Sequence, residues 1–324
     1  MSSACGWLVG WALVVSGQPA VSAEVSQDGV VSFKLGTAEV TRYHAHSKVA
    51  KPYFWPVITP GGVAVTRDWP MVPDAKEAKD HKHQKSAWFC HGDVVLEGHQ
   101  APKRKGIEGV DFWSEETGHG TIVATAIAKP TPSGQGSVTV RTSNIWKDST
   151  GKAILTEART LVFRSRDASS WVMEVTSEIT ASEGGIVFED TKEGSFGVRV
   201  RDDLTEKPGK GVLTNAEGLK GEKNLWGKKS AWCDYSGPTG GKVAGVAIVT
   251  HPDNKYPTCW HARGYGLMAA NPFGRSKSGF PDMKGRTDLV KLAKGETLKL
   301  TYAMVVHDGD AEAAKPGQNV FGKN

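Results

Sequence analysis

The chain has 324 residues, of which 39% are hydrophobic and 23% charged, and its formal net charge is +5. These proportions are those of an ordinary globular protein, so they exclude a disordered chain, a collagen-like fibre and a coiled coil. After the first segment no apolar run reaches the ~18 residues that cross a bilayer, which excludes a multi-span membrane protein. The positive charge is too dispersed to predict a nucleic-acid partner.

The first 23 residues contain no Lys, Arg, Asp or Glu. Residues 5–15 form an apolar core of the length found in secretory signals, and Val21, Ser22 and Ala23 give a small-residue cleavage pattern. We therefore predict a signal peptide over residues 1–23 and a secreted or periplasmic mature chain with no membrane partner. Because no basic residue precedes the apolar core, a buried N-terminal strand is the alternative.

The remaining chain shows the period-2 alternation of β-strands, interrupted by turn residues. No segment carries an amphipathic helical stripe over three turns, so the rhythm of Rossmann and TIM folds is absent. We predict an all-β fold, a large antiparallel sandwich, and a single domain over residues 24–324, although length alone suggests about two domains. The predicted strands are residues 30–35, 38–43, 121–126, 138–145, 153–163, 171–180, 196–200, 244–249 and 298–306.

Cysteine spacing leaves two interpretations open. Once Cys5 is removed with the signal, Cys90, Cys233 and Cys259 remain, an odd number. Cys233 and Cys259 could form one disulfide, or all three could be buried thiols. No C-x-x-C pair occurs, so the spacing does not support a structural zinc or a thioredoxin-type site.

The densest polar cluster runs from Asp80 through His81 and His83 to His91, and continues at Asp111 and the neighbouring Trp113. His81 and His83 are two residues apart, so on an extended backbone both rings point to the same face, as paired metal ligands must. A divalent metal held by His81, His83 and His91 is one interpretation. A metal-free polar pocket is the second, and a solvated loop rich in lysine is the third.

A second cluster contains Asp190, Lys192 and Glu193, just before a predicted strand. Neighbouring carboxylates with a lysine could supply an acid and a base, because nearby charges separate the pKa values of two carboxyl groups. A charged hairpin turn is the alternative.

A third cluster interleaves aromatic rings with polar side chains, as saccharide sites do, because rings stack on C–H faces while polar groups pair with hydroxyls. We predict Trp113 and Trp260 as stacking platforms, against the alternative that they belong to the core. The polar members are Asp234, His251, His261 and Asn271. Sequence signatures of serine nucleophiles, phosphate-binding loops and dinucleotide sites are missing, so no nucleotide cofactor is expected.

These motifs recur in one known set of proteins. The blocks are residues 52–57 (PYFWPV), 65–70 (VTRDWP), 80–83 (DHKH), 88–92 (WFCHG), 111–113 (DFW), 157–159 (EAR), 190–194 (DTKEG), 226–228 (WGK), 234–237 (DYSG), 251–252 (HP), 260–261 (WH), 265–266 (YG), 270–274 (ANPFG) and 307–310 (HDGD). Together they resemble the secreted bacterial PmoA-like family of uncharacterised proteins. One block departs from the family, which usually has D-H-P-H-H where this chain has Lys82 and Gln84.

The resemblance implies a β-supersandwich similar to galactose-mutarotase-like domains, with histidines and carboxylates on a concave sheet face. The family name comes from a membrane subunit of methane monooxygenase, and without spanning helices methane oxidation is not expected here. If the family histidine at position 84 were an essential base or ligand, Gln84 would remove its activity.

We therefore expect a carbohydrate-active protein that binds a saccharide, with acid/base chemistry of the epimerase, lyase or hydrolase type at a sugar carbon. A non-catalytic carbohydrate-binding or structural module and a metal-dependent enzyme are the alternatives. Candidate catalytic residues are His81, His83, Asp111, Asp190 and Glu193; candidate substrate-binding residues are Trp113, Lys192, Asp234, His251, Trp260, His261 and Asn271.

Overall fold

The structure is a computed structural model that describes residues 19–134 and 136–322. Strands make up almost all of its regular structure. In these ranges one sheet, sheet A, has the strand order β1 (Val21–Val25), β2 (Val30–Leu35), β3 (Ala38–His44), β4 (Tyr53–Val57), β5 (Ala87–His91), β13 (Gly194–Arg199), β18 (Leu267–Asn271) and β17 (Cys259–Arg263). The helical segments described are single turns: η1 (Asp202–Leu204), α1 (Glu222–Leu225), η2 (Pro281–Met283) and α2 (Ala311–Ala314).

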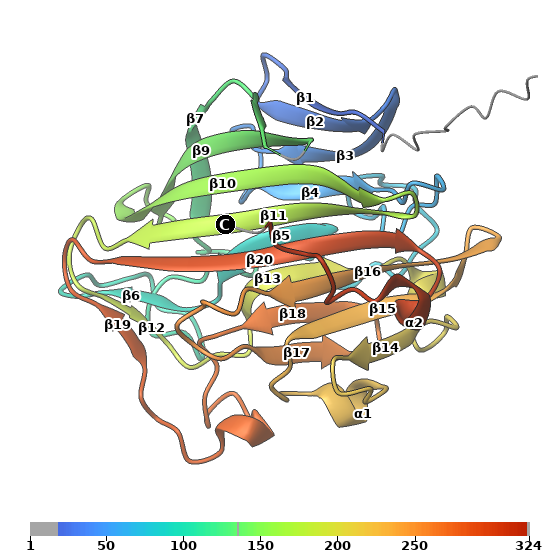
Figure 1. The fold of residues 1–324 in the computed structure, drawn as a ribbon. Helices are drawn as coiled ribbons and strands as arrows, with labels where there is room; N and C mark the ends of the chain where they lie inside the picture. The colour runs from blue at the N-terminus through green and yellow to red at the C-terminus, as the bar shows by residue number, and fades with distance from the viewer. Residues whose placement is uncertain (1–18, 135, 323–324) are drawn as a thin grey trace, which may run out of the picture.

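A second large sheet, sheet B, lies against sheet A, and every strand pair in both sheets is antiparallel (Figure 1). Its order in the described ranges is β14 (Val212–Asn215), β15 (Trp232–Thr239), β16 (Lys242–Thr250), β20 (Thr297–Asp308), β11 (Ser170–Thr180), β10 (Ala153–Asp167), β9 (Ser137–Lys147) and β7 (Thr121–Ile127), with β8 (Thr131–Ser133) beside β9. A small sheet joins β19 (Val290–Leu292), β12 (Ile186–Phe188) and β6 (Val94–Leu96). The predicted all-β antiparallel sandwich is confirmed.

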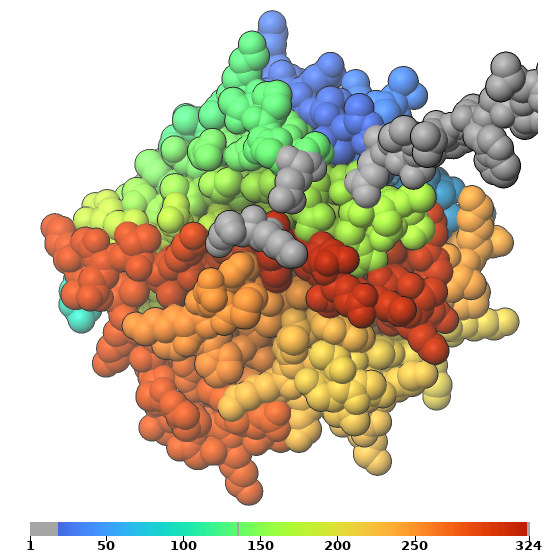
Figure 2. All heavy atoms as spheres, viewed as in Figure 1, coloured from blue at the N-terminus to red at the C-terminus, as the bar shows by residue number. Residues whose placement is uncertain are grey.

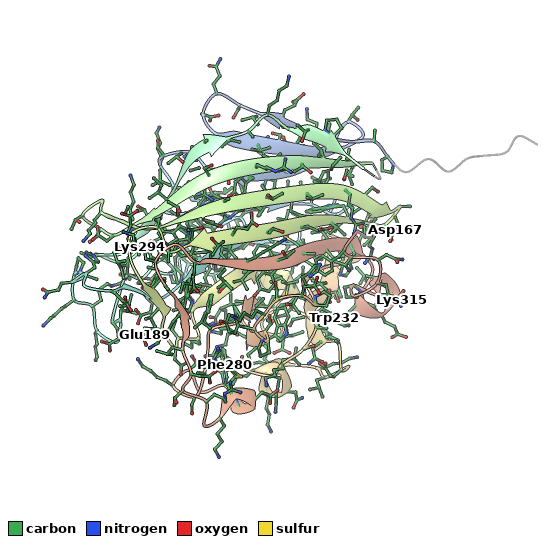
Figure 3. All side chains as sticks on the ribbon, turned by 60° about the vertical axis from the view of Figure 1, so that its left-hand side comes forward. Asp167, Glu189, Trp232, Phe280, Lys294 and Lys315 are labelled. Atoms are coloured by element: carbon green, nitrogen blue, oxygen red, sulfur yellow. The ribbon has the colours of Figure 1, made fainter. Side chains whose placement is uncertain are left out.

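The space between sheets A and B is filled by large apolar side chains (Figure 3). The ring of Phe33 on β2 packs edge-on against Phe163 on β10, at 5.4 Å between centroids. Phe196 on β13 stacks on Tyr302 of β20 at 6.1 Å. Each predicted strand is present with its ends at most four residues from the predicted ones, because the long strands bury one face and so alternate in sequence.

A buried ion pair on β10 of sheet B is hydrogen-bonded to sheet A. Arg159 and Glu157 on β10 are both almost fully buried, and Arg159 Nε donates to Glu157 Oε1 at 2.7 Å. The Arg159 guanidinium also donates to the hydroxyl of Tyr43 on β3, at 3.0 Å. Glu157 accepts further hydrogen bonds from Trp146 Nε1 and Ser177 Oγ. Both charges are therefore compensated in the interior.

The C-terminal residues cover the outer face of sheet B, as the red surface in Figure 2 shows. Val320 packs there with Val172 and Val305 in a small second core. Beneath this cover His307 Nε2 pairs with Asp234 Oδ2 at 2.8 Å, with both side chains fully buried.

The predicted signal segment falls mostly on residues 1–18, outside the described residues. Strand β1, Val21–Val25, pairs with β2 and runs across the predicted cleavage point after Ala23. No helix among the described residues is long and apolar enough to cross a membrane. Cys90, Cys233 and Cys259 are buried free thiols, so the alternative of a Cys233–Cys259 disulfide is wrong for this structure.

The buried pair predicts an asymmetry between single and double substitutions. Replacing Arg159 by Met leaves the Glu157 carboxylate buried without its cation, which should lower the free energy of unfolding by about 3–5 kcal/mol. In the double variant Glu157→Gln/Arg159→Met no charge remains, so at least about 1 kcal/mol of that loss should be recovered. Urea denaturation measures both. A double variant less stable than Arg159→Met would contradict this account of the interface.

Candidate functional site

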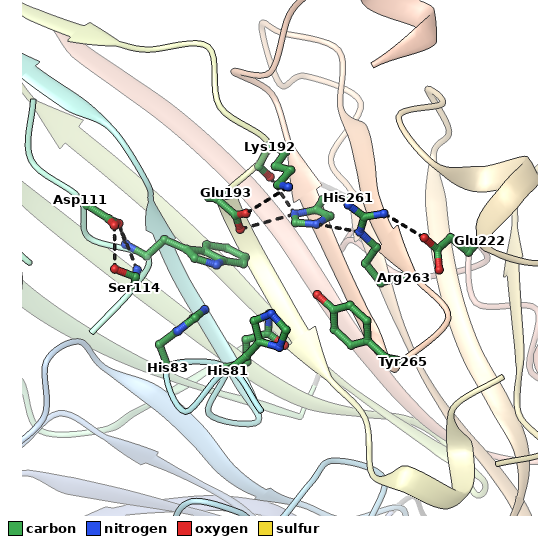
Figure 4. A pocket seen from close by; sticks show the side chains of 12 residues that line it. His81, His83, Asp111, Ser114, Lys192, Glu193, Glu222, His261, Arg263 and Tyr265 are labelled. Atoms are coloured by element: carbon green, nitrogen blue, oxygen red, sulfur yellow. Dashed lines mark hydrogen bonds and ion pairs between the residues drawn. The ribbon is translucent and has the colours of Figure 1, made fainter. Parts of the chain in front are cut away.

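The polar residues of several predicted clusters meet in a pocket of about 420 Å³. Figure 4 shows Lys192, Glu193 and His261 on one side, facing His81 and His83 on the other. We call this the histidine pocket. Its lining residues are His81, His83, Gln84, Asp111, Trp113, Ser114, Lys192, Glu193, Glu222, His261, Arg263 and Tyr265.

Strand alternation decides which side chains reach the pocket. Paired residues of neighbouring strands share a face, and Trp88, Gly197, Ala269 and His261 form one row across β5, β13, β18 and β17. This is the face turned away from sheet B. A Cβ at Gly197 would lie 2.8 Å from the Trp88 ring, so glycine is needed there for the indole to lie flat on the strand.

The neighbouring row points inward. Phe196 contacts Tyr302 of sheet B, and Trp260 is fully buried with its Nε1 donating to Ser230 O at 3.1 Å. The prediction of Trp260 as a sugar platform is therefore wrong. Adjacent residues on a strand face opposite sides, so Trp260 and His261 cannot both line the pocket.

His81 is held by the carboxylate that precedes it in the chain. Its Nδ1 lies 2.6 Å from Asp80 Oδ2. Burial alone would raise the pKa of Asp80, but hydrogen bonds from Arg199 and His81 outweigh it and hold that pKa at about 2. An ionised carboxylate only accepts, so Nδ1 of His81 donates to Asp80, and in the neutral form of the ring Nε2 keeps its lone pair. Tyr265 stacks on the imidazole at 5.2 Å.

Two buried arginines fix Asp80 in turn. Arg199 on β13 donates from Nη2 to Oδ1 at 2.8 Å, and Arg67 donates from Nη2 to the Asp80 carbonyl oxygen at 2.8 Å. Arg199 also donates to Gln84 Oε1 at 2.7 Å. Gln84 is thus a buried partner of Arg199, at the position where the PmoA-like pattern has His. A carbonyl oxygen there serves the arginine as an acceptor, as a histidine nitrogen would.

His83 stands beside His81, with the two rings edge to face at 5.8 Å. Burial, together with the positive charge of Lys51, lowers the pKa of His83 to about 3, so the ring is neutral. Neither of its ring nitrogens has a hydrogen-bond partner among the described residues. His83 therefore offers one donor and one acceptor to a ligand.

Among the carboxylates that line the pocket, Glu193 has the fewest hydrogen-bond partners. Two nitrogens lie near its carboxylate, His261 Nδ1 at 3.7 Å and Lys192 Nζ at 3.9 Å, and both are beyond hydrogen-bond distance. Burial raises the pKa of Glu193 to about 7, against the opposing effect of Lys192. A Cβ on Gly92 would lie 2.7 Å from Glu193 Cβ, and Gly92 N donates to Glu193 O at 2.6 Å. The His91-Gly92 block thus positions Glu193.

His261 has both ring nitrogens occupied. Its Nδ1 donates to the Lys192 carbonyl oxygen at 2.9 Å, and its Nε2 lies 3.4 Å from Arg263 Nε. Burial and the charges of Arg263 and Lys192 lower the pKa of His261 to about 3. Arg263 also donates to Glu222 Oε1 at 2.9 Å and lies 4.0 Å over the Trp226 ring. His261 is therefore a fixed, neutral wall of the pocket.

Asp111 braces the opposite wall. Its Oδ1 accepts from the backbone N–H groups of Trp113 and Ser114, and its Oδ2 accepts from Arg104 Nη1 and Ser114 Oγ. With four donors its oxygens are saturated, so Asp111 shapes the loop that carries Trp113. The Trp113 indole is nearly parallel to the His261 ring at 6.3 Å, and its buried Nε1 has no partner among the described residues.

Four other predicted site residues lie outside the pocket lining. Asp190 accepts backbone N–H groups of Arg275, Lys277 and Ser278, and Asn271 donates to the Thr191 and Lys192 carbonyls: both hold loops. Asp234 is buried against His307 under the C-terminal segment, and His251 contacts Phe321 on the same side. Their assignments as catalytic or substrate-binding groups are corrected: Asp190 and Asn271 satisfy backbone groups of loops, and Asp234 and His251 lie on the side covered by the C-terminal segment.

The three-histidine metal centre is not assembled. His91 is buried against Phe188 and Phe273, with Nε2 at 3.0 Å from the Glu189 carbonyl oxygen, away from His81 and His83. Within residues 19–134 and 136–322 no group of three or more His, Cys, Asp or Glu side chains could hold a metal ion. The His91 ring thus packs among aromatic side chains and does not join His81 and His83.

Five lining residues were absent from the predicted set: Gln84, Ser114, Glu222, Arg263 and Tyr265. Arg263 could have been found, since it is two residues beyond His261 on β17 and so shares its face. No sequence pattern indicates Glu222. It lies on the single turn α1, and its ion pair with Arg263 places it at the pocket.

A larger hollow of about 800 Å³ lies elsewhere, between β14, β15 and α2. Trp232 and Val212 are among its lining residues, but none of the predicted site residues is. The histidine pocket is the better candidate because perturbed pKa values converge on it.

The sequence was also compared with known families. The profile of DUF6807, a family of unknown function, matches residues 30–319. The chain belongs to the DUF6807 family. All lining residues of the histidine pocket fall inside the matched range. No curated protein matches this DUF6807 chain in sequence.

Solved structures with a similar fold include a heparan sulfate lyase from Pedobacter heparinus, at 7% identity and a TM-score of 0.40, where 89% of this chain covers 37% of the lyase. A GH36 α-galactosidase from Geobacillus stearothermophilus has 10% identity and a TM-score of 0.40, with coverages of 93% and 41%. A GalM/aldose epimerase homologue from C. elegans has 9% identity and a TM-score of 0.35, with coverages of 90% and 99%. The chain thus spans less than half of the lyase and of the galactosidase, and scores of this size place no activity on it.

The Asp80–His81 contact predicts a tautomer. With Asp80→Asn, Arg199 Nη2 and Arg67 Nη1 keep the side-chain oxygen at the Oδ1 position. The new NH₂ then replaces Oδ2, loses the 3.2 Å hydrogen bond from Arg199 Nη1 and donates to His81 Nδ1. The ring proton should then move to Nε2. The ¹⁵N shifts of the labelled imidazole, assigned with a His81→Gln variant, report the proton's position. A wild-type ring protonated on Nε2, or the same tautomer in both proteins, would contradict the assignment.

Proposed function

We propose that this DUF6807 protein binds a saccharide in the histidine pocket and performs acid/base chemistry at a sugar carbon. One observation carries the proposal: Glu193, which holds its proton up to about neutral pH, faces an imidazole whose Nε2 lone pair is exposed by the Asp80 contact. Proton transfer to and from a substrate requires one group that donates a proton and another that accepts one.

In this proposal Glu193 is the acid and His81 the base. Glu193 gives its proton to the sugar oxygen that gains negative charge, while His81 Nε2 takes the proton from a hydroxyl or a carbon. Asp80 stabilises the imidazolium that forms, and Arg199 keeps Asp80 in place. The neutral His83 can bind a hydroxyl as donor and acceptor without adding charge.

The pocket's walls suit a sugar ring. The Trp113 and Tyr265 rings supply apolar atoms to the lining, while Ser114 and Lys192 add polar atoms. Rings of this kind pack against C–H groups and leave the hydroxyls to polar partners. The PmoA-like resemblance is consistent with this class of ligand. Export through the signal peptide is part of the proposal.

Substitution of Glu193 tests the acid. Glu193→Gln keeps the shape and removes the transferable proton, so turnover should fall about 10²–10⁴-fold. A panel of aldoses and methyl glycosides, followed by ¹H NMR in D₂O, detects epimerisation, elimination and hydrolysis together. Because the Glu193 carboxylate makes no short contact, Tm at pH 5, where wild-type Glu193 is also uncharged, should change little.

The matched control is Glu217→Gln, an exposed glutamate outside the pocket lining. It should retain wild-type turnover. Wild-type turnover in Glu193→Gln would contradict the role of Glu193, and sugar binding with no product in the wild type would point to a non-catalytic module.

The raised pKa of Glu193 also predicts a pH effect on stability. Between its usual pKa of 4.5 and about 7, the folded state keeps a proton that the unfolded state has lost, so stability falls as pH rises through this window. Glu193→Gln cannot ionise. Relative to wild type it should therefore gain about 1–3 kcal/mol in the free energy of unfolding between pH 5 and pH 7.5. Urea denaturation at both pH values measures this, and a difference independent of pH would overturn the shift.

A further inference from the structure

The carboxylates around the histidine pocket are already occupied. Asp111 accepts from four donors, two of them backbone N–H groups. Glu222 accepts from Arg263 Nη1 at 2.9 Å and from the N–H of Gly264 at 2.7 Å. Asp80 accepts from Arg199, Arg67 and His81. These acceptors have little capacity left for the hydroxyl protons of a ligand.

Apart from Glu193 and the ring nitrogens of His81 and His83, the groups that remain unoccupied are donors. The Lys192 side chain is 42% exposed, and its Nζ has no acceptor closer than Glu193 at 3.9 Å in the described part of the chain. Arg263 uses Nε and Nη1, and its Nη2 has no partner within the same residues. The buried Nε1 of Trp113 is likewise unpartnered. A ligand that pairs with these donors is rich in hydrogen-bond acceptors.

Charge points the same way. Asp111 is paired with Arg104 at 2.8 Å and Glu222 with Arg263, so neither leaves net negative charge at the rim. Asp80 carries one negative charge between the two cations Arg67 and Arg199. Lys192 is compensated only at long range, and only when Glu193 is ionised. The pocket with Glu193 protonated is therefore net positive.

We propose that the histidine pocket is selective for anionic saccharides, with the carboxylate of a sugar acid bound by Lys192 and Arg263. This inference rests on the proposed function, since it names the substrate class of the same site. Arg263 can meet a carboxylate through Nη2 while it stays paired with Glu222, and Lys192 adds a mobile charge. Glu193 then lies next to the bound acid, and its proton prevents repulsion.

Calorimetric titration with matched glycosides tests the inference. The probes are the methyl glycosides of glucuronic, galacturonic and mannuronic acid and of the neutral glucose, galactose and mannose. At least one uronide should bind about tenfold or more tightly than its neutral partner at pH 6. The preference should weaken at pH 8, where ionised Glu193 repels the carboxylate, and Glu193→Gln should remove that pH dependence.

Lys192→Met separates charge from shape. It should weaken uronide binding about tenfold and leave neutral glycosides unaffected, while Lys294→Met, an exposed lysine outside the pocket lining, should change neither. Equal binding of uronides and neutral glycosides, or a Lys192→Met effect on both, would overturn the anionic class and leave the proposed function standing. If no probe binds and the imidazole NMR signals of His81 and His83 do not respond, both proposals fail.

Discussion

The ion pair between Arg199 and Asp80 is the interaction on which the site depends. Arg199 is only 1% exposed, and a buried guanidinium is costly unless acceptors surround it. Asp80, Gln84 and the face of Tyr265 supply that surrounding. Arg199 lies on β13, the strand that follows Glu193, and Asp80 lies on the loop before β5, which also carries His81 and His83. Their ion pair therefore joins this loop to β13.

The pocket's chemistry follows from how this loop lies over sheet A. Gly197 has no side chain and Ala269 only a methyl group, so the loop that carries Trp113 can come close to this face of sheet A. The polar groups between the loop and the sheet are then buried. Burial then lowers the pKa of His83 and raises that of Glu193. The same desolvation thus keeps His83 neutral and Glu193 protonated near neutral pH, without any metal ligand set among the described residues.

Much of the fold could be predicted from the sequence, and less of the site. Strands such as β11 bury one face and alternate visibly, whereas β5 and β18 are buried on both faces and carry no period-2 signal. His81, His83 and Glu193 were found because charged and ring side chains crowd their segments. Trp260 was misassigned because the sequence does not indicate which side chains of β17 face the interior. Glu222 could not be found, because its place depends on a tertiary contact.

The most direct measurement is a crystal structure of the protein soaked with the methyl glycosides of galactose and galacturonic acid. The account predicts a sugar ring in the histidine pocket, with one oxygen within hydrogen-bond distance of Glu193 and a hydroxyl or C–H directed at His81 Nε2. A sugar found instead in the larger hollow beside Trp232, with the histidine pocket empty, would contradict it.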